Sequence, residues 1–466
     1  MGLNKNILNL AIPSILANIT VPIVGMTDIA VAGHLNASSL FSVATLIGGV
    51  SIGSMLFDLL YWNFFFLRIS TGGLTAQAYG RGDMKEAAAI FSRAVGIALL
   101  CSFLLIAVQW VFVKGAFMFV DCTPEVRELA SQYFFVRIWA APATMSLMAL
   151  KGWFIGMQDS LNSMITDLVV NGMNILMSIV LALGLHVGSF SFEGYGFTGI
   201  AAGTVVAQYS GLICAAVIIL VKYGKKVFGD YGFKDFAEAF SGAKMRVFFT
   251  MNTDLFVRSL CFIGIYIGFT IFSAHYGDLL LASSTIMMKI LMIFSYFTDG
   301  FAYAGEALAG RYIGAQDKSN LQRTIKLVFL WSMGLGVIFT FIYAFAGVPM
   351  LKVMTTDEAV VDISRSYLPW LVLMPVVGCA AFTWDGIYIG ATASKTIRNA
   401  MLLAAGGFFL TYIAGIGLLK AFEPEKVVYS KIAIHILLAA YFIHLVVRTI
   451  YLSAKHKKEI LIDPFE

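Results

Sequence analysis

The chain is dominated by long apolar segments separated by short polar loops. Each segment has roughly 20 residues or more, which is enough to cross a hydrocarbon core about 30 Å thick as an α-helix, and none shows the alternating pattern of barrel strands. With 59% hydrophobic and 13% charged residues, too little polar surface remains to cover a soluble protein of this size. The sequence therefore predicts an all-α integral membrane protein.

Twelve spans are predicted, six in each half of the chain. Their expected boundaries are 8–33, 40–67, 89–118, 129–150, 160–186, 197–221, 247–273, 280–304, 323–347, 366–389, 396–420 and 429–452. The expected domains are an N-terminal six-helix lobe at 1–222, a cytoplasmic basic linker at 223–246, a C-terminal six-helix lobe at 247–453 and a cytoplasmic tail at 454–466. Because the linker interleaves aromatic and basic residues, we expect it to form a short amphipathic helix at the membrane surface.

The two halves resemble each other at an offset of 234 residues. The most informative matches are glycines and polar loop residues that recur at this offset. Matches between apolar residues mean less, because a biased apolar composition gives many chance identities. The matched residues are Leu74, Gly80, Asp83, Gly152, Ile155 and Gly156, which recur as Leu308, Gly314, Asp317, Gly386, Ile389 and Gly390. An offset covering six spans gives both halves the same orientation, so we expect a pseudo-two-fold axis along the membrane normal.

The distribution of basic residues predicts the orientation. Of the 32 Lys and Arg residues, 22 fall in loops on the side of the N-terminus and 7 in loops on the opposite side. Both termini are therefore expected in the cytoplasm, with the chain in the cell inner membrane. The net charge of +5 follows from this bias and gives no reason to expect a nucleic-acid partner.

Known catalytic and metal-binding patterns are missing from the sequence. It contains no HExxH, no phosphate-binding P-loop and no GxSxG, and its five cysteines are scattered without a metal or disulfide spacing. We therefore expect neither an enzyme nor a bound cofactor or metal.

Asp28 is the sharpest functional candidate, because a carboxyl inside a span is costly and is rarely kept without use. It lies about 20 residues into the first span, where it can act as a proton-carrying group. The alternative is a carboxyl solvated near the outer interface. Pro13 and Pro22 lie in the same span and each removes a backbone hydrogen bond, so this helix can bend.

The fifth span carries a polar stripe on one helix face, formed by Asp167, Asn171, Asn174 and Ser178. Spans one and five run in the same direction, and Ser178 lies at a depth similar to that of Asp28. The two polar patches are thus candidates for one shared cavity and for cation coupling. The competing interpretation is that Asn174 and Ser178 only join helices through hydrogen bonds.

Further charged residues lie in spans or near their inner ends. Asp254 and Arg258 are four residues apart, so we expect them to pair with each other. The others are weaker cavity candidates, for which snorkelling or structural pairing is the commoner explanation. They are Arg137, Asp58, Asp299, Glu306 and Asp385.

Several stretches resemble the DinF-type branch of the multidrug and toxic compound extrusion (MATE) family. They are AIPSILANITVPIVGMTDIAVAGHL from residue 11, LLYWNFFFLRISTGGLTAQAYGRGD from 59, YFFVRIWAAPA from 133, GWFIGMQ from 152 and WDGIYIGAT from 384. The resemblance implies two six-helix lobes forming a V-shaped cavity and cation-driven export of lipophilic, often cationic, compounds. It also places the family's first-helix acid on Asp28, its bending proline on Pro13 and its fifth-helix asparagine on Asn174.

The sequence departs from archaeal relatives at Ser178, where they have a second aspartate. One carboxyl is then left in the N-terminal lobe, which favours proton coupling through Asp28 and leaves sodium open. We expect an antiporter, monomeric and surrounded by lipids, working by alternating access. The alternatives are a flippase for a lipid-linked precursor and, from another class, a receptor or scaffold that transports nothing.

Overall fold

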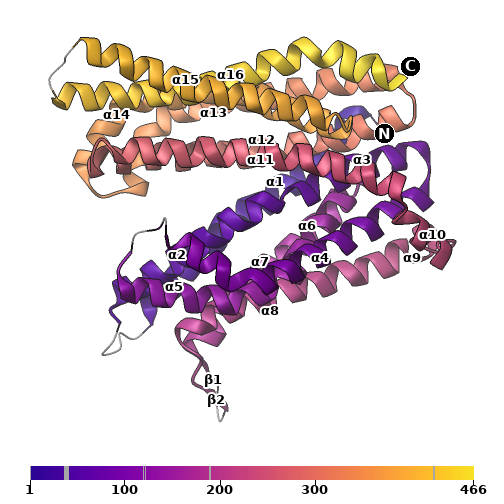
Figure 1. Cartoon of the computed structure of the whole chain (residues 1–466), viewed down its shortest axis with the longest axis horizontal. Coiled ribbons are helices and arrows are strands. Elements are labelled where there is room, and N and C mark those ends of the chain that lie inside the picture. Colours follow the sequence, from indigo (N-terminus) through magenta and orange to yellow (C-terminus); the bar gives the residue numbers. More distant parts are fainter. Residues whose placement is uncertain are drawn as a thin grey trace. The chain divides into compact units, whose positions relative to one another are not determined.

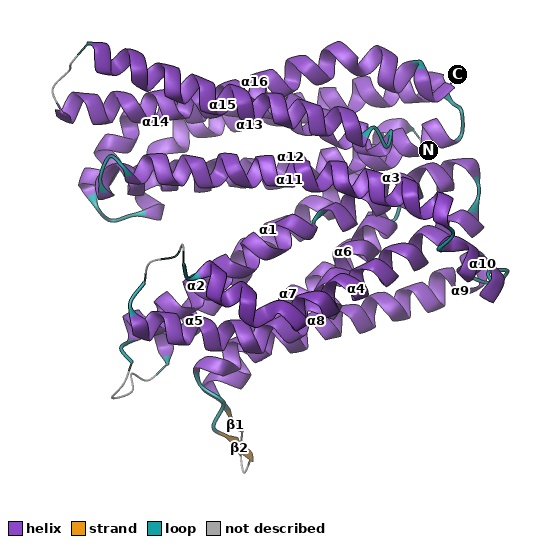
Figure 2. Cartoon of the chain, in the orientation of Figure 1, coloured by secondary structure: helices purple, strands orange, loops and turns teal. Residues whose placement is uncertain are grey.

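The computed structural model describes residues 2–35, 41–118, 120, 122–187, 190–422 and 426–465. Helices make up nearly all of this part of the chain (Figures 1 and 2). In the first half they are α1 (Leu3–His34), α2 (Val43–Phe64), α3 (Phe66–Arg81), α4 (Met84–Ala116), α5 (Pro124–Arg137), the 3-10 turn η1 (Ile138–Ala140), α6 (Ala141–Gly156), α7 (Ser160–Leu183), α8 (Phe197–Ile218), the π-helical turn η2 (Ile219–Tyr223), α9 (Gly224–Val227) and α10 (Phe233–Ala239). In the second half they are α11 (Gly242–Ala274), α12 (Asp278–Gly314), α13 (Lys318–Met354), α14 (Glu358–Gly390), α15 (Ser394–Ala421), α16 (Lys426–Leu461) and the 3-10 turn η3 (Asp463–Phe465).

Twelve helical segments within the described residues are long and apolar enough to cross a membrane, which confirms the predicted number. Four of them combine consecutive elements: Val43–Arg81, Pro124–Gly156, Phe197–Val227 and Val428–Phe465. The fifth span is shorter than expected, because α7 ends at Leu183 and Gly184 follows with a φ of 88°. The next residues form a small antiparallel hairpin of β1 (Leu185–Val187) and β2 (Phe190–Phe192). The predicted start of the second span, residue 40, lies outside the described residues.

The contacts divide the chain into two compact units. The N-terminal unit consists of Leu16–Val247, and the C-terminal unit consists of Phe248–Glu466 together with Met1–Ile15. The division falls inside α1, so the first half of that helix packs with the C-terminal spans. The linker belongs to the N-terminal unit. The final helix continues through most of the expected tail, and Gln316 donates a hydrogen bond of 3.0 Å to the carbonyl of Pro464.

Close helix packing at glycines confirms the internal repeat. A methyl group added to Gly152 would lie 2.2 Å from the carbonyl oxygen of Arg68, and one added to Gly386 would lie 2.1 Å from that of Ala302. Both contacting residues are also 234 positions apart. Only glycine allows the two backbones to approach this closely, so the repeated glycines reflect the same packing of α6 on α3 and of α14 on α12.

The loops that follow these packed helices also repeat. Gln158 and Thr392, at equivalent positions, both have positive φ angles, of 62° and 55°. Three loops of this kind end in an aspartate whose carboxylate accepts from the backbone of the next helix, as capping requires. These are Asp83 before α4, Asp159 before α7 and Asp317 before α13.

Asp159 is held more firmly than an ordinary cap. Lys222 Nζ lies 2.7 Å from its Oδ2, the hydroxyl of Tyr223 donates to the same oxygen, and the side chain of Asn162 donates to it at 2.6 Å. Burial by itself raises the pKa of the carboxyl, but hydrogen bonds from Lys222, Tyr223 and Asn162 and the charge of Lys222 outweigh it, so the pKa of Asp159 is lowered.

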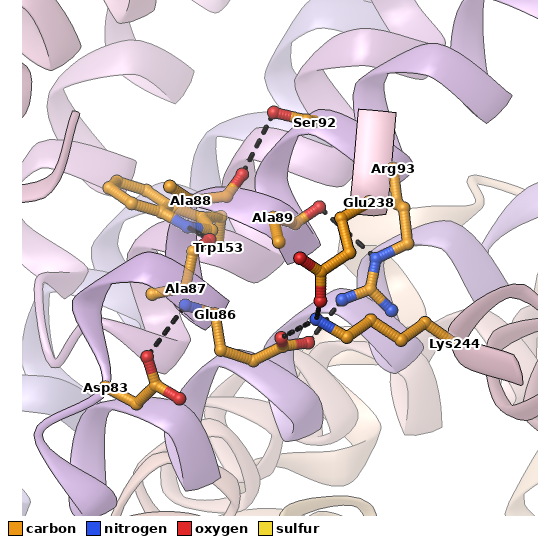
Figure 3. A network of polar contacts seen from close by, with 10 residues as sticks. All are labelled: Asp83, Glu86, Ala87, Ala88, Ala89, Ser92, Arg93, Trp153, Glu238 and Lys244. Carbon is orange, nitrogen blue, oxygen red and sulfur yellow. Dashed lines mark hydrogen bonds and ion pairs between the residues drawn. The ribbon is translucent and has the colours of Figure 1, made fainter. Parts of the chain in front are cut away.

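The linker is docked onto α4 by a polar network (Figure 3). Glu86 accepts from Arg93 and, at 3.2 Å, from Lys244, which also lies 3.5 Å from Glu238 of α10. The Trp153 indole donates to the carbonyl of Ala87 at 2.9 Å beside this network. The linker does contain the expected short helix, α10, but its position at a membrane surface stays a prediction.

Candidate functional site

The structure brings the polar patches of α1 and α7 into contact. Asp28 of α1 is 4% exposed, and the fully buried Ser178 of α7 donates a hydrogen bond of 2.9 Å from its Oγ to Asp28 Oδ1. This contact joins residues 150 positions apart, as their similar depth in parallel spans had predicted. The carboxyl is therefore a buried group held by a neighbouring helix, which contradicts the alternative of an aspartate solvated at the interface.

A threonine of α8 orients the next residue of the cluster. Asn174 Nδ2 donates to Thr204 Oγ1 at 2.9 Å, and both side chains are buried. The amide oxygen of Asn174 consequently faces Ser178 Oγ, 3.5 Å away, and the carbonyl oxygen of Ile200 lies 3.4 Å from the same hydroxyl. Ser178 thus has an acceptor on α1, on α7 and on α8.

Sequence reasoning missed Thr204. The signal that was available is a pair of glycines on α8, because a methyl group on Gly199 would lie 2.1 Å from the carbonyl of Leu181 and one on Gly203 would lie 2.5 Å from the backbone of Ser178. Such small residues four positions apart allow α8 to lie directly against α7. A polar residue next to them then faces the α7 stripe.

The rest of the α7 stripe is divided among different partners. Asn171 donates to Thr20 Oγ1 of α1, and half-buried Asp167 forms an ion pair of 2.7 Å with Lys151 of α6. Asp167 therefore does not join the Asp28 cluster. The stripe spans several turns of α7, and its four members contact three different helices: α1, α6 and α8.

Arg137 lies near the cluster, in contact with hydroxyl groups and aromatic rings. Its Nη1 donates to Tyr133 Oη at 2.9 Å and to Ser54 Oγ at 3.4 Å, and its guanidinium lies 4.8 Å from the ring centroid of Phe57. Its charge acts on Asp28 and on Asp58, a residue exposed on α2. The N-terminal unit therefore places a cation within electrostatic range of the buried carboxyl.

The two prolines do not interrupt α1. The helix continues through half-buried Pro13 and exposed Pro22, from Leu3 to His34. The bending that these residues permit remains a prediction.

The C-terminal unit has a buried charged cluster of its own. Asp385 Oδ2 on α14 accepts from Arg258 of α11 at 2.5 Å and from Arg448 of α16 at 2.6 Å. Asp254 instead bonds to Arg398 at 2.6 Å and to Ser394 at 2.8 Å. The predicted pairing of Asp254 with Arg258 is wrong, because each residue reaches a partner on a different helix.

The other C-terminal candidates lie on α12: Asp299 is half-buried and Glu306 is fully buried. Within the described residues, no group of three or more His, Cys, Asp or Glu side chains is placed to hold a metal ion. The chemistry that the described residues support is therefore ionisation and hydrogen bonding of carboxyls buried between helices.

These features define a polytopic membrane protein built from two repeats of six spans, each with a buried charged cluster. A family model described as MatE matches residues 13–180 and 255–413, so the chain belongs to the multidrug and toxic compound extrusion (MATE) family of transporters. The resemblance noted in the sequence is confirmed.

Among curated relatives, the DNA damage-inducible protein F of Escherichia coli K12 is 32% identical over 88% of this chain and 85% of its own length. A probable multidrug resistance protein NorM of Photorhabdus laumondii is 25% identical over 85% and 84%. Among solved structures, a MATE protein in the bent conformation matches with a TM-score of 0.81 over 98% of this chain and 97% of its own, at 13% identity. That likeness shows the fold.

Proposed function

We propose that this protein is a cation-coupled antiporter, with the proton as the coupling ion, that exports lipophilic and often cationic organic compounds by alternating access. Its membership of the MATE family and its relatives named for multidrug resistance support export of such compounds. The single observation that carries the coupling proposal is the buried hydrogen bond between Ser178 and Asp28.

The surroundings of Asp28 suit both of its protonation states. When the carboxyl is ionised, the single hydroxyl proton of Ser178 is donated to Asp28 Oδ1. When the carboxyl takes up a proton, its own O–H can donate to Ser178 Oγ, and the serine proton can turn to Ile200 or Asn174. A proton is then gained or lost without leaving a buried polar group unsatisfied, which would cost about 1–3 kcal/mol.

Coupling requires that substrate and proton exclude each other. In the proposed cycle, a cationic substrate binds while Asp28 is ionised, and protonation from outside removes the negative charge that favours it. While Asp28 is ionised, its charge and that of Arg137 cancel, so protonation of Asp28 leaves this pair with one net positive charge, which disfavours a cationic substrate. The change in affinity between the two states, together with bending of α1 at Pro13 and Pro22, provides the driving force for release.

The orientation and surroundings are part of the same proposal. We infer a monomer in the cell inner membrane, with both termini in the cytoplasm and the linker at the cytoplasmic membrane surface, because most basic loop residues lie on that side. No bound cofactor or metal is required.

Efflux of a fluorescent cation such as ethidium from proteoliposomes tests the proposal, with either a pH gradient or a sodium gradient imposed. Proton-driven efflux in the wild type that is lost in Asp28→Asn is expected, while Asp167→Asn, which changes an ion-paired carboxylate on α7, should keep proton coupling. Sodium-driven efflux that survives in Asp28→Asn would refute Asp28 as the coupling group.

A further inference from the structure

The helix α1 is packed at both ends and unpacked in between. Near its start, a buried stripe follows one helix face and is formed by Ile7, Leu10, Ala11 and Ser14. Near its end, Val31 and Ala32 belong to the hydrophobic core of the N-terminal unit. The structure describes every residue of α1, and none of those between Asn18 and Asp28 is buried. A bend within this stretch, residues 19–27, therefore breaks no core contact.

Pro13 lies in the packed part of α1. The helix touches α12 on either side of this proline, because a methyl group added to Gly300 would lie 2.7 Å from the carbonyl oxygen of Ala11 and 2.4 Å from Cγ1 of Ile15. Contacts this close leave no room for α1 to change direction at Pro13 unless α12 moves as well. The turn that contains Pro13 is therefore rigid, although it lacks a backbone hydrogen bond.

Three features that weaken a helix lie close together in the unpacked stretch. Exposed Pro22 has no N–H to bond to the carbonyl four residues earlier, and its ring crowds that carbonyl. Gly25 follows, and a methyl group added to it would meet nothing within 4 Å, so this glycine costs helix stability without serving packing. Thr27 donates from its hydroxyl to the carbonyl of Ile23 at 2.9 Å, a bond that often accompanies helix bending. The stretch is thus the place where α1 bends at least cost.

Polar bonds to α7 hold the two ends of this stretch. Asn171 of α7 donates to the Thr20 hydroxyl at its start, and Ser178 of α7 donates to Asp28 directly after its end. The carboxyl assigned above as the proton carrier therefore lies next to the flexible part of its own helix. A change in the bond to Asp28 acts directly on one end of the stretch.

Protonation is the event that changes this bond. The titratable groups that act on Asp28 are Arg137 and Tyr133, both on α5, while α7 and α8 contribute the neutral side chains of Ser178 and Thr204 to the cluster. A hydrogen bond to an ionised carboxylate is about twice as strong as one between neutral groups. Neutralising Asp28 consequently loosens the hold of α7 on the end of the stretch.

We propose that α1 bends at Pro22 and Gly25, and that residues 3–15, including Pro13, form a rigid arm packed on α12. The inference rests on the function proposed above, because protonation of Asp28 is the event that releases the bend. Pro22 is then a positioning residue, which acts by setting how Asp28 meets α7.

Spin labels on α1 of the full chain, with its five native cysteines replaced by alanine, test where the helix bends. Labels at Leu16→Cys and Ile29→Cys span Pro22, and labels at Lys5→Cys and Leu16→Cys span Pro13; all three positions are exposed. The two separations in a straight helix are about 20 Å and about 17 Å, which pulsed electron paramagnetic resonance measures. We expect the 16–29 distance to change between neutral and acidic pH and the 5–16 distance to stay constant.

Three variants separate the hinge from its trigger. Pro22→Ala restores the missing backbone bond and should suppress the change in the 16–29 distance, whereas Pro13→Ala is the matched control and should keep it. A 5–16 distance that changes with pH, or a wild-type 16–29 distance that does not, would overturn the inference. A 16–29 change that persists in Asp28→Asn would leave the hinge in place and refute Asp28 as the coupling group.

Ethidium efflux from proteoliposomes under a pH gradient supplies the functional readout. Bending must break the backbone hydrogen bond that Pro22→Ala restores, so this variant should lower the efflux rate by about two- to tenfold and leave the Kd for ethidium unchanged. Pro13→Ala should keep the wild-type rate. Efflux that is slowed by Pro13→Ala and not by Pro22→Ala would overturn the inference, and the distances decide the hinge even where no ethidium is transported.

Discussion

Replacing Asp385 with asparagine should destabilise the C-terminal unit strongly. The change removes the charge that compensates two arginines, of which Arg448 has a side chain only 2% exposed and Arg258 one 16% exposed. Removing one partner of a buried ion pair costs about 3–5 kcal/mol, and losing two charged hydrogen bonds at about 1.5–3 kcal/mol each gives a similar sum. Against a total stability of about 5–15 kcal/mol, this is a large fraction.

The same helix provides the control. Asp362 lies 3.7 Å from Arg365, and the side chains of this pair are 71% and 51% exposed. An exposed pair contributes about 0–1 kcal/mol, so Asp362→Asn should barely change stability. A cost of 3–5 kcal/mol corresponds to a Tm lower by roughly 6–20 °C for a unit of this size.

The assay is the apparent Tm of the purified protein in detergent, followed by tryptophan fluorescence. A double variant, Asp385→Asn with Arg448→Met, should recover part of the loss because it also removes one uncompensated charge. Equal Tm values for Asp385→Asn and Asp362→Asn would refute the reasoning, since they would show that the buried arginines do not need this carboxylate.

Three more predictions concern packing, pH and the linker. Gly386→Ala should cost about 1–3 kcal/mol through overpacking, whereas Gly417→Ala, whose added methyl group meets nothing within 4 Å, should be neutral or stabilising; equal Tm values would contradict the packing argument. Because the pKa of Asp159 is lowered in the folded protein, its contribution to stability is complete above the ordinary aspartate pKa of about 3.9 and is lost as the pH falls through the folded value. The Tm difference between wild type and Asp159→Asn should therefore shrink between neutral pH and pH values below about 3.9, and a constant difference would disprove the assignment. Glu86→Gln should loosen the linker, because it removes the carboxylate that holds Lys244. Limited proteolysis within residues 223–246 should then be faster, and an unchanged cleavage rate would show that the network does not dock the linker.

The architecture was predictable because two strong physical signals act along the sequence. Spans are specified by hydropathy over about 20 residues, and the repeat by glycines such as Gly152 and Gly386 that permit backbone contact. The end of the fifth span was placed too late because apolar Leu185 and Val187 follow Gly184, although they belong to a strand of the hairpin. Apolar character alone does not separate a helix end from a short strand.

The candidate site was predictable only in part. The contact between Asp28 and Ser178 could be predicted because their two helices run in the same direction. The rise per residue then gives the depth of each residue along its helix, and the two depths are similar. The partners of Arg258 and Asn174 depend on which side of a helix meets which neighbour, and this is a tertiary property. An i, i+4 spacing would allow Asp254 to pair with Arg258 on the same helix. In the structure, each instead bonds to a partner on another helix, Asp254 to Arg398 and Arg258 to Asp385.

The central claim is that Asp28 gives up a proton when substrate binds. The most direct measurement is proton release by the purified protein in weakly buffered detergent, recorded with a pH indicator as ethidium is added across the physiological pH range. Release approaching one proton per bound ethidium in the wild type, and none in an Asp28→Asn variant that still binds ethidium, is the predicted result. Equal proton release by both proteins, or ethidium binding without any proton release over the whole range, would contradict the account.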